Sequence, residues 1–192
     1  MDPLDARAAL REATAPLHAE VDTGLPLARP SPTLADYRAH LQLLSDWTAR
    51  LRSLPVDARR LDTQAAALAV DLAECDRLLG TPPERASTAT HVDIAAQTPA
   101  DAEAFGWGIA YVIEGSQLGG QVLYRRLAES LAPHPLAYLR GTGRDTGAHW
   151  KGFLAELQRQ LATPARIRAA CDGAVHAFGL LLACHRASEL RA

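Results

Sequence analysis

The sequence lacks the features that mark several large classes of protein. Its 20 basic and 22 acidic residues are dispersed and give a formal net charge of −2, so neither a nucleic-acid-binding surface nor a polybasic membrane anchor is indicated. The first residues are acidic and pass directly into a helical pattern, with no signal peptide visible. The most apolar stretches are interrupted by polar residues or are too short to span a bilayer. We therefore expect a cytoplasmic protein with no nucleic-acid partner and no membrane partner.

Cysteine and the common catalytic signatures are also scarce. The three cysteines (Cys75, Cys171 and Cys184) include no closely spaced pair, and their odd number, with no export signal, favours reduced and buried thiols. The chain contains no GxxxxGK[ST] phosphate loop, no His-Glu-x-x-His zinc motif and no Glu-x-x-His pair. These absences disfavour phosphate-loop, zinc-hydrolase and di-iron carboxylate chemistry.

The pattern that is present is helical. No stretch alternates apolar and polar residues for long enough to predict a strand, and prolines separate the segments that have helical periodicity. This pattern predicts one all-α domain over residues 1–192 with six to eight helices. Start signals stand at Ser31-Pro32-Thr33 and at Thr163-Pro164. Helices are expected near 4–22, 33–53, 60–79, 100–131, 146–161 and 164–189, while 84–98 is either a short helix or a loop.

The first predicted helix offers a candidate ligand. Its apolar residues recur at three and four positions, and His18 lies at the edge of this core-facing stripe. Arg11, two turns earlier on nearly the same face, is about 10 Å away along the axis. A neutral imidazole can bind iron while such an arginine pairs with a carboxylate of the same large ligand. Taken alone, a structural histidine and a solvated arginine are the more common explanation. Pro16 is expected to bend the helix just before His18.

A later helical segment is unusually rich in glycine. Each interior glycine costs roughly 1 kcal/mol relative to alanine, so this composition indicates that something approaches the backbone closely. Gly115 and Gly119 lie one turn apart, with Ser116 and Gly120 alongside, and would form a flat floor for a planar ligand. Close packing between two helices and a break into two shorter helices are the alternatives. The five glycines are Gly106, Gly108, Gly115, Gly119 and Gly120.

These two segments, in this order and at this separation, resemble the haem oxygenase family. Leu10-Arg-Glu-Ala-Thr followed by His18 is similar to the family's proximal helix, and Leu118-Gly-Gly-Gln-Val-Leu is similar to its distal helix. The closing segment, with Thr163-Pro-Ala and Ala177-Phe178, is similar too, so the resemblance covers most of the chain. The stretch Glu114-Gly-Ser-Gln-Leu-Gly-Gly most resembles bacterial members, including those that supply biliverdin to bacteriophytochromes.

The resemblance implies an all-α, haem-oxygenase-like bundle with haem between the proximal helix and a kinked, glycine-rich distal helix. Haem would be both cofactor and substrate, cleaved with O2 and external electrons to biliverdin (normally IX-alpha), carbon monoxide and free iron. The electron donor would be a ferredoxin, a flavodoxin or an NADPH-linked reductase. An acidic donor would dock near Arg125 and Arg126, unless these are simply solvated. A bacteriophytochrome is one suggested recipient of biliverdin, and iron acquisition is the other role left open.

The resemblance also implies roles for individual residues. His18 corresponds to the axial ligand of the haem iron, and Arg11 to a basic residue that pairs with a haem propionate. Asp22 corresponds to an acidic residue that orients the ligand imidazole through water. Phe178 corresponds to an aromatic position near the ring, and Lys151 is the candidate for a further propionate contact.

The distal side departs from the family pattern at one position. Gly115, Gly119 and Gly120 match distal-helix glycines, but Ser116 stands where the mammalian members carry an aspartate. A serine hydroxyl can anchor one water of a distal cluster, so we expect Ser116 to permit turnover. Tyr111, one turn before Gly115, is expected either to border the pocket or to pack in the core.

Two other functions stay open at this point. The same fold could hold haem or a bilin without turning it over, and Ser116 is the residue that favours such a catalytically silent binder. A helical interaction module without a ligand is the third possibility, which the five-glycine helix and the paired motifs disfavour.

Overall fold

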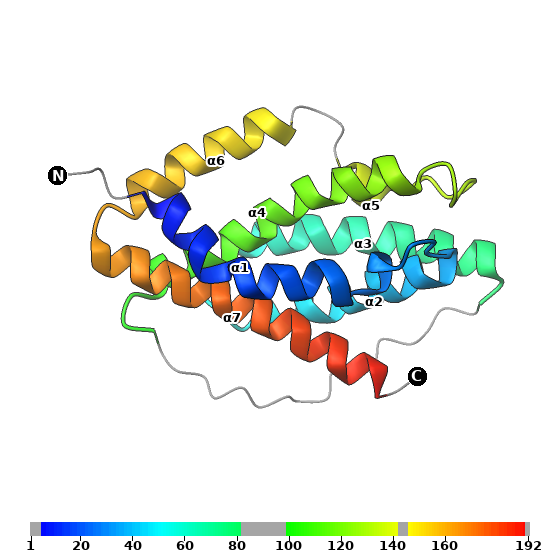
Figure 1. Cartoon of the computed structure of the whole chain (residues 1–192), viewed down its shortest axis with the longest axis horizontal. Coiled ribbons are helices and arrows are strands. Elements are labelled where there is room, and N and C mark those ends of the chain that lie inside the picture. The colour runs from blue at the N-terminus through cyan, green and yellow to red at the C-terminus, as the bar shows by residue number, and fades with distance from the viewer. Residues whose placement is uncertain (1–4, 82–98, 142–145, 191–192) are drawn as a thin grey trace.

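The computed structural model describes residues 5–81, 99–141 and 146–190. These residues form seven α-helices and one short 3-10 helix, joined by loops (Figure 1). No strand occurs among these residues, so the predicted all-α class is confirmed. The elements are α1 (Ala6–Gly24), η1 (Pro26–Ala28), α2 (Leu34–Leu51), α3 (Ala58–Leu79), α4 (Ala102–Leu127), α5 (Ala137–Arg140), α6 (Thr146–Gln160) and α7 (Pro164–Glu189).

The helix ends follow local capping chemistry. Thr33 caps α2 in a reciprocal capping box with Asp36, and the Thr163 hydroxyl accepts the Arg166 N–H at the start of α7, where Pro164 occupies the first turn. Both predicted starts are therefore confirmed. The sequence did not predict α5, because a single turn of four residues has no periodicity to detect. The segment 84–98 lies outside the described residues.

The core forms around α7, which packs against α1, α2 and α4. The close approach of α7 to α4 depends on glycines, which have no side chain. A Cβ on Gly108 would overlap the carbonyl oxygen of Ala170, and one on Gly173 would overlap that of Phe105. Trp47 of α2 is fully buried and donates its indole N–H to the Ala177 carbonyl at 2.8 Å. These contacts join α2, α4 and α7 into one tightly packed unit.

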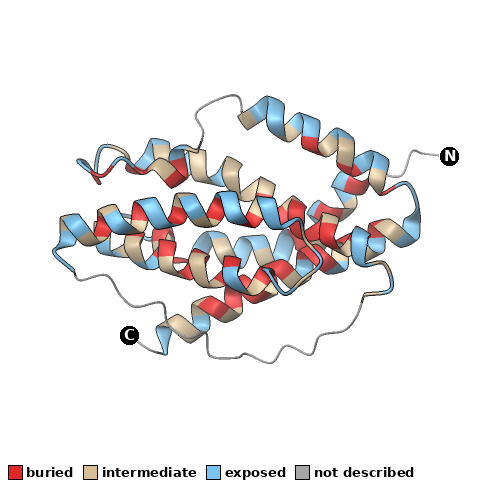
Figure 2. Cartoon of the chain, turned by 180° about the vertical axis from the view of Figure 1, so that it is seen from behind, coloured by how far each residue is buried: buried red, intermediate tan, exposed pale blue. Residues whose placement is uncertain are grey.

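The helices differ in how much of their surface this core covers. Buried residues lie on the inner faces of the packed helices, and exposed residues follow their outer faces (Figure 2). In α6 only Phe153 and Leu157 are buried, and this helix contacts α4 and α1. The helices α1, α4, α6 and α7 therefore position the candidate site. Of these four helices, α6 has the fewest buried residues. Cys75 and Cys184 are buried, as expected, whereas Cys171 is only partly buried.

The length and hydropathy of α7 correct one expectation. Among the described residues it is the one helix long and apolar enough to cross a membrane, whereas the sequence analysis predicted no such stretch. In the most apolar window of α7, 56% of the residues are buried inside the bundle. A helix that packs on several neighbours needs the same apolar side chains as a helix in lipid, so composition alone does not separate the two.

Candidate functional site

His18 lies on α1 with its side chain 60% exposed, farther from the core than the sequence predicted. The buried residues Ala6, Leu10 and Thr14 recur every four positions. Each step of four residues turns about 40° around the helix, so the next position, His18, no longer faces the core. Pro16 lies inside α1, which changes direction about midway (Figure 1), as predicted. The imidazole is thus available to a ligand.

Two neighbours hold the imidazole in place. Nδ1 of His18 lies 2.9 Å from Oδ2 of Asp22, one turn later, so the contact is direct where the sequence analysis expected a bridging water. The ring also lies 5.8 Å from that of Phe178 on α7, which is 7% exposed. With Nδ1–H donated to the carboxylate, Nε2 carries the lone pair that a metal ligand needs.

Two arginines on α1 lie near a tyrosine of α4. Burial raises the pKa of Tyr111, and the nearby guanidinium groups of Arg7 and Arg11 oppose that rise. Both arginines are exposed and stand one turn apart on one face of α1. Tyr111 therefore borders the site and is half-buried, with its ring 5.6 Å from that of Trp150 on α6. Sequence reasoning missed Arg7, although its spacing of four from Arg11 places the two on the same face.

Lys151 lies on α6 directly after Trp150 and stays a candidate for a propionate contact. Lys151 is exposed and makes no hydrogen bond or ion pair with the residues that are described. Trp150 instead faces α4, where its Cη2 is the nearest atom, at 3.8 Å, to a Cβ placed on Gly115. Lys151 points elsewhere because adjacent residues on a helix are about 100° apart.

The glycines of α4 fall into two groups. A Cβ on Gly106 would overlap the Pro55 carbonyl oxygen and one on Gly108 that of Ala170, so here close packing against a neighbouring segment explains the glycine. A Cβ on Gly119 would meet nothing within 4 Å, and one on Gly115 would make only ordinary van der Waals contact. Gly120 is intermediate, with the Leu139 carbonyl oxygen at 3.4 Å from such a Cβ. Because α4 is continuous from Ala102 to Leu127, the alternative of two shorter helices is wrong.

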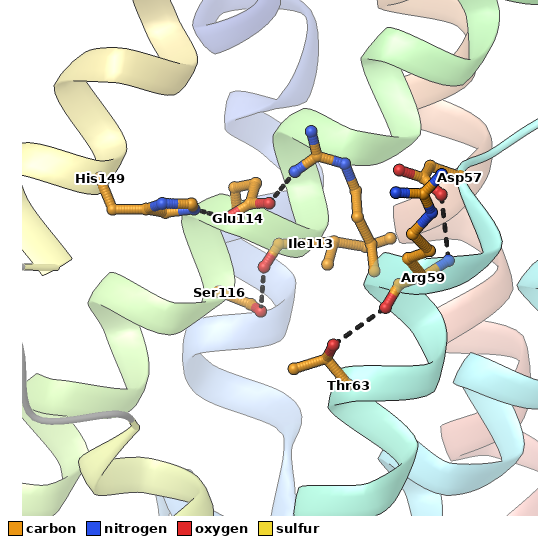
Figure 3. Close-up of polar contacts among 8 residues, drawn as sticks. Asp57, Arg59, Thr63, Ile113, Glu114, Ser116 and His149 are labelled. Atoms are coloured by element: carbon orange, nitrogen blue, oxygen red, sulfur yellow. Dashed lines mark hydrogen bonds and ion pairs between the residues drawn. The ribbon is translucent and has the colours of Figure 1, made fainter.

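The polar residues beside these glycines point in different directions. The Glu114 carboxylate, 11% exposed, pairs with Arg60 of α3 and lies 2.9 Å from Nε2 of His149 on α6 (Figure 3). The Ser116 hydroxyl donates to the Ile113 carbonyl at 2.6 Å (Figure 3). Glu114 thus fastens α4 to its neighbours and leaves Ser116 as the polar side chain beside Gly115, as their spacing of two residues predicts.

Arg125 and Arg126, the basic pair at the end of α4, differ in their contacts. Both arginines are exposed, but Arg126 also donates a hydrogen bond to the Leu27 carbonyl of η1. The guanidinium of Arg126 therefore ties α4 to the segment after α1, and Arg125 is the freer of the two charges for a protein partner.

Two hollows lie elsewhere on the described surface. One, of about 520 Å³, lies between the start of α2, the end of α3 and the segment after α4, and its lining has no ionisable side chain. The other, of about 220 Å³, is lined by Asp57, Arg60 and Glu103 among other residues. Among the described residues no three His, Cys, Asp or Glu side chains are grouped to bind a bare metal ion. A single imidazole suffices as the protein ligand when a macrocycle supplies the other donors to iron. His18, the open floor at Gly115 and Gly119, and the Arg7–Arg11 pair together fit a flat, anionic iron macrocycle.

Comparison with known proteins gives two matches. The family model described as heme oxygenase matches residues 4–186. A heme oxygenase from Xanthomonas campestris pv. campestris (strain 8004) is 38% identical over 144 residues, which cover 73% of this chain and 76% of the relative.

Proposed function

The chain belongs to the haem oxygenase family, and we propose that it holds haem on His18 while it opens the ring. The activity is that of a haem oxygenase: haem, O2 and electrons from a reductase partner yield biliverdin, carbon monoxide and iron. Haem supplies the oxygen chemistry at its iron, and the protein supplies orientation, a polar distal side and steric selection.

The observation that carries the His18 assignment is its pairing with Asp22. An imidazole with Nδ1 held at 2.9 Å by a carboxylate presents Nε2 as an acceptor in a defined direction. Phe178 packs beside the ring and limits its rotation. His40 of α2 is buried in the core at 7% exposure and has no open side for a macrocycle.

Other residues of the site support an orientation for haem. We propose that Arg7 and Arg11, near the Tyr111 hydroxyl, pair with the propionates. Exposed pairs of this kind contribute only about 0–1 kcal/mol, so they would select the haem orientation more than the affinity. Gly115 and Gly119 would let the α4 backbone approach the ring, which leaves one meso carbon, the α carbon in our proposal, facing bound oxygen.

The partners follow from the same assignment. We propose that a ferredoxin, a flavodoxin or an NADPH-linked reductase docks beside Arg125, which is exposed at the end of α4. The sequence Glu114-Gly-Ser-Gln-Leu-Gly-Gly favours a bacteriophytochrome as the recipient of biliverdin, in the cytoplasm.

Haemin titration of His18→Ala tests the central assignment. We expect the variant to lose the Soret spectrum of the histidine-ligated complex, and Asp22→Ala to weaken haem binding by roughly 10- to 100-fold because the imidazole is no longer oriented. His176→Ala, a half-buried histidine of α7, is the matched control and should bind haem normally. A wild-type spectrum in His18→Ala would reject the assignment. A wild-type complex that survives reductant and O2 unchanged would identify a binder without turnover.

A further inference from the structure

Trp150 of α6 is the side chain that stands against the distal helix α4 at Gly115. Its Cη2 atom lies 3.8 Å from the position of a Cβ on Gly115, whereas a Cβ on Gly119, one turn later, has no such neighbour within 4 Å. The ring of Trp150 also lies 5.6 Å from that of Tyr111, which is on α4 one turn before Gly115. The open floor of the candidate site therefore ends at Gly115, where an indole covers it.

An aromatic stack fixes the direction of this indole. The rings of Trp150 and Phe153, both on α6, have centroids 5.5 Å apart and planes inclined by 20°, so they lie nearly parallel. Phe153 is 6% exposed, its ring lies 5.9 Å from that of Trp107 on α4, and the Arg60 guanidinium stands 5.4 Å from its centroid. Because Phe153 belongs to the packed interior, it holds the Trp150 ring in one orientation at the edge of the site.

The residue before Trp150 ties α6 to the same part of α4. Nε2 of His149 lies 2.9 Å from Oε2 of Glu114, the residue next to Gly115, and Glu114 also pairs with Arg60 of α3 (Figure 3). The Glu114 carboxylate is 11% exposed, and such polar contacts are stronger away from bulk water. Although few residues of α6 are buried, its first turns are thus fastened to α4 at the level of Gly115.

We propose that Trp150 is a specificity-determining residue whose indole ends the haem pocket at Gly115 and so selects which meso carbon of the ring is cleaved. This inference rests on the proposed function, because it concerns a ring held by His18. A macrocycle with one axial protein ligand is still free to rotate about that bond. The exposed arginines of α1 attract carboxylates only weakly, whereas a packed indole excludes any rotation that brings a ring substituent into its space.

The test compares Trp150→Ala and Trp150→Phe in the full chain loaded with haemin, with two readouts. These are the isomer composition of the biliverdin, by chromatography, and the haem-methyl NMR signals of the ferric cyanide complex, which report ring rotation before any turnover. Trp150→Ala should raise the share of minor isomers about 5-fold and add new haem-methyl signals. Trp150→Phe keeps an aromatic ring and should restore most of the wild-type pattern. Trp107→Leu is the matched control, because it removes an indole about two turns before Gly115, and should change neither readout.

Two outcomes would overturn the proposal: wild-type isomers and wild-type NMR signals in Trp150→Ala, or equal changes in Trp150→Ala and Trp107→Leu. If Trp150→Ala does not fold, His149→Ala releases α6 from Glu114 at an exposed position and should raise the share of minor isomers by about 2-fold. Unchanged isomers in His149→Ala would then reject the proposal. Failure of the proposed function has a different signature, because the wild-type protein would bind no haem through His18 or form no biliverdin.

Discussion

In the first half of α4, a Cβ added to Gly106 or Gly108 would overlap a backbone carbonyl oxygen of a neighbouring segment, whereas at Gly119, about three turns beyond Gly108, it would meet no atom within 4 Å. The first half belongs to the closed core with α2 and α7. The second half lies beside Trp150 of α6 at Gly115 and bonds the segment after α1 through Arg126. One helix therefore uses glycine for two purposes, and the glycine content alone does not separate them.

The largest effect is expected at Gly108, in the closed half. Gly108→Ala places a methyl group against the Ala170 carbonyl, and backbone cannot rotate away as a side chain can. We expect a loss of about 3 kcal/mol or more in the free energy of unfolding, measured in urea without haem. Gly119→Ala is the matched control. Equal stability of the two variants would show that the halves of α4 are alike.

A second effect in the closed region depends on pH. His40 of α2 is buried beside His185, and burial lowers its pKa from 6.5 to about 4. The unfolded chain therefore binds this proton between about pH 6.5 and 4 while the folded chain does not, so stability falls as the pH falls through that interval. The loss is on the order of 3 kcal/mol at about 1.4 kcal/mol per pKa unit.

His40→Leu should remove this component, and unfolding measured from pH 7 to 4 checks it. A wild-type dependence on pH in the variant would assign the effect to other groups. Haem binding at neutral pH should not change, because His40 belongs to the core and not to the open face.

The smallest effect is expected at Gly119, in the open half. With free space around the added methyl group, Gly119→Ala should stabilise the haem-free protein by about 0.5–1 kcal/mol, the helix preference of alanine. Gly119→Leu should fill the space assigned to haem and reduce the yield of biliverdin. Unfolding curves and product analysis measure the two quantities. Destabilisation by alanine, or normal biliverdin from the leucine variant, would place Gly119 with the packing glycines.

Features that depend on neighbours in the sequence were predictable. The helix starts at Thr33 and Thr163 were predicted correctly because each side chain bonds a backbone N–H of its own first turn. The order of the His18 and glycine motifs likewise indicated the family to which the chain belongs. His18 and Asp22 could be paired in advance, since their spacing is one helical turn.

Features that depend on contacts between distant segments were not predictable in this way. The Gly108–Ala170 approach and the position of Tyr111 near Arg7 both depend on how α1, α4 and α7 pack. The same holds for Tyr138, which lies on the single-turn helix α5 and accepts a hydrogen bond from Gln64 of α3. Helical periodicity shows which residues share a face, but it carries no information about the segment that this face meets. That assignment comes from the packing of the whole bundle, where shape and burial across the chain select one arrangement.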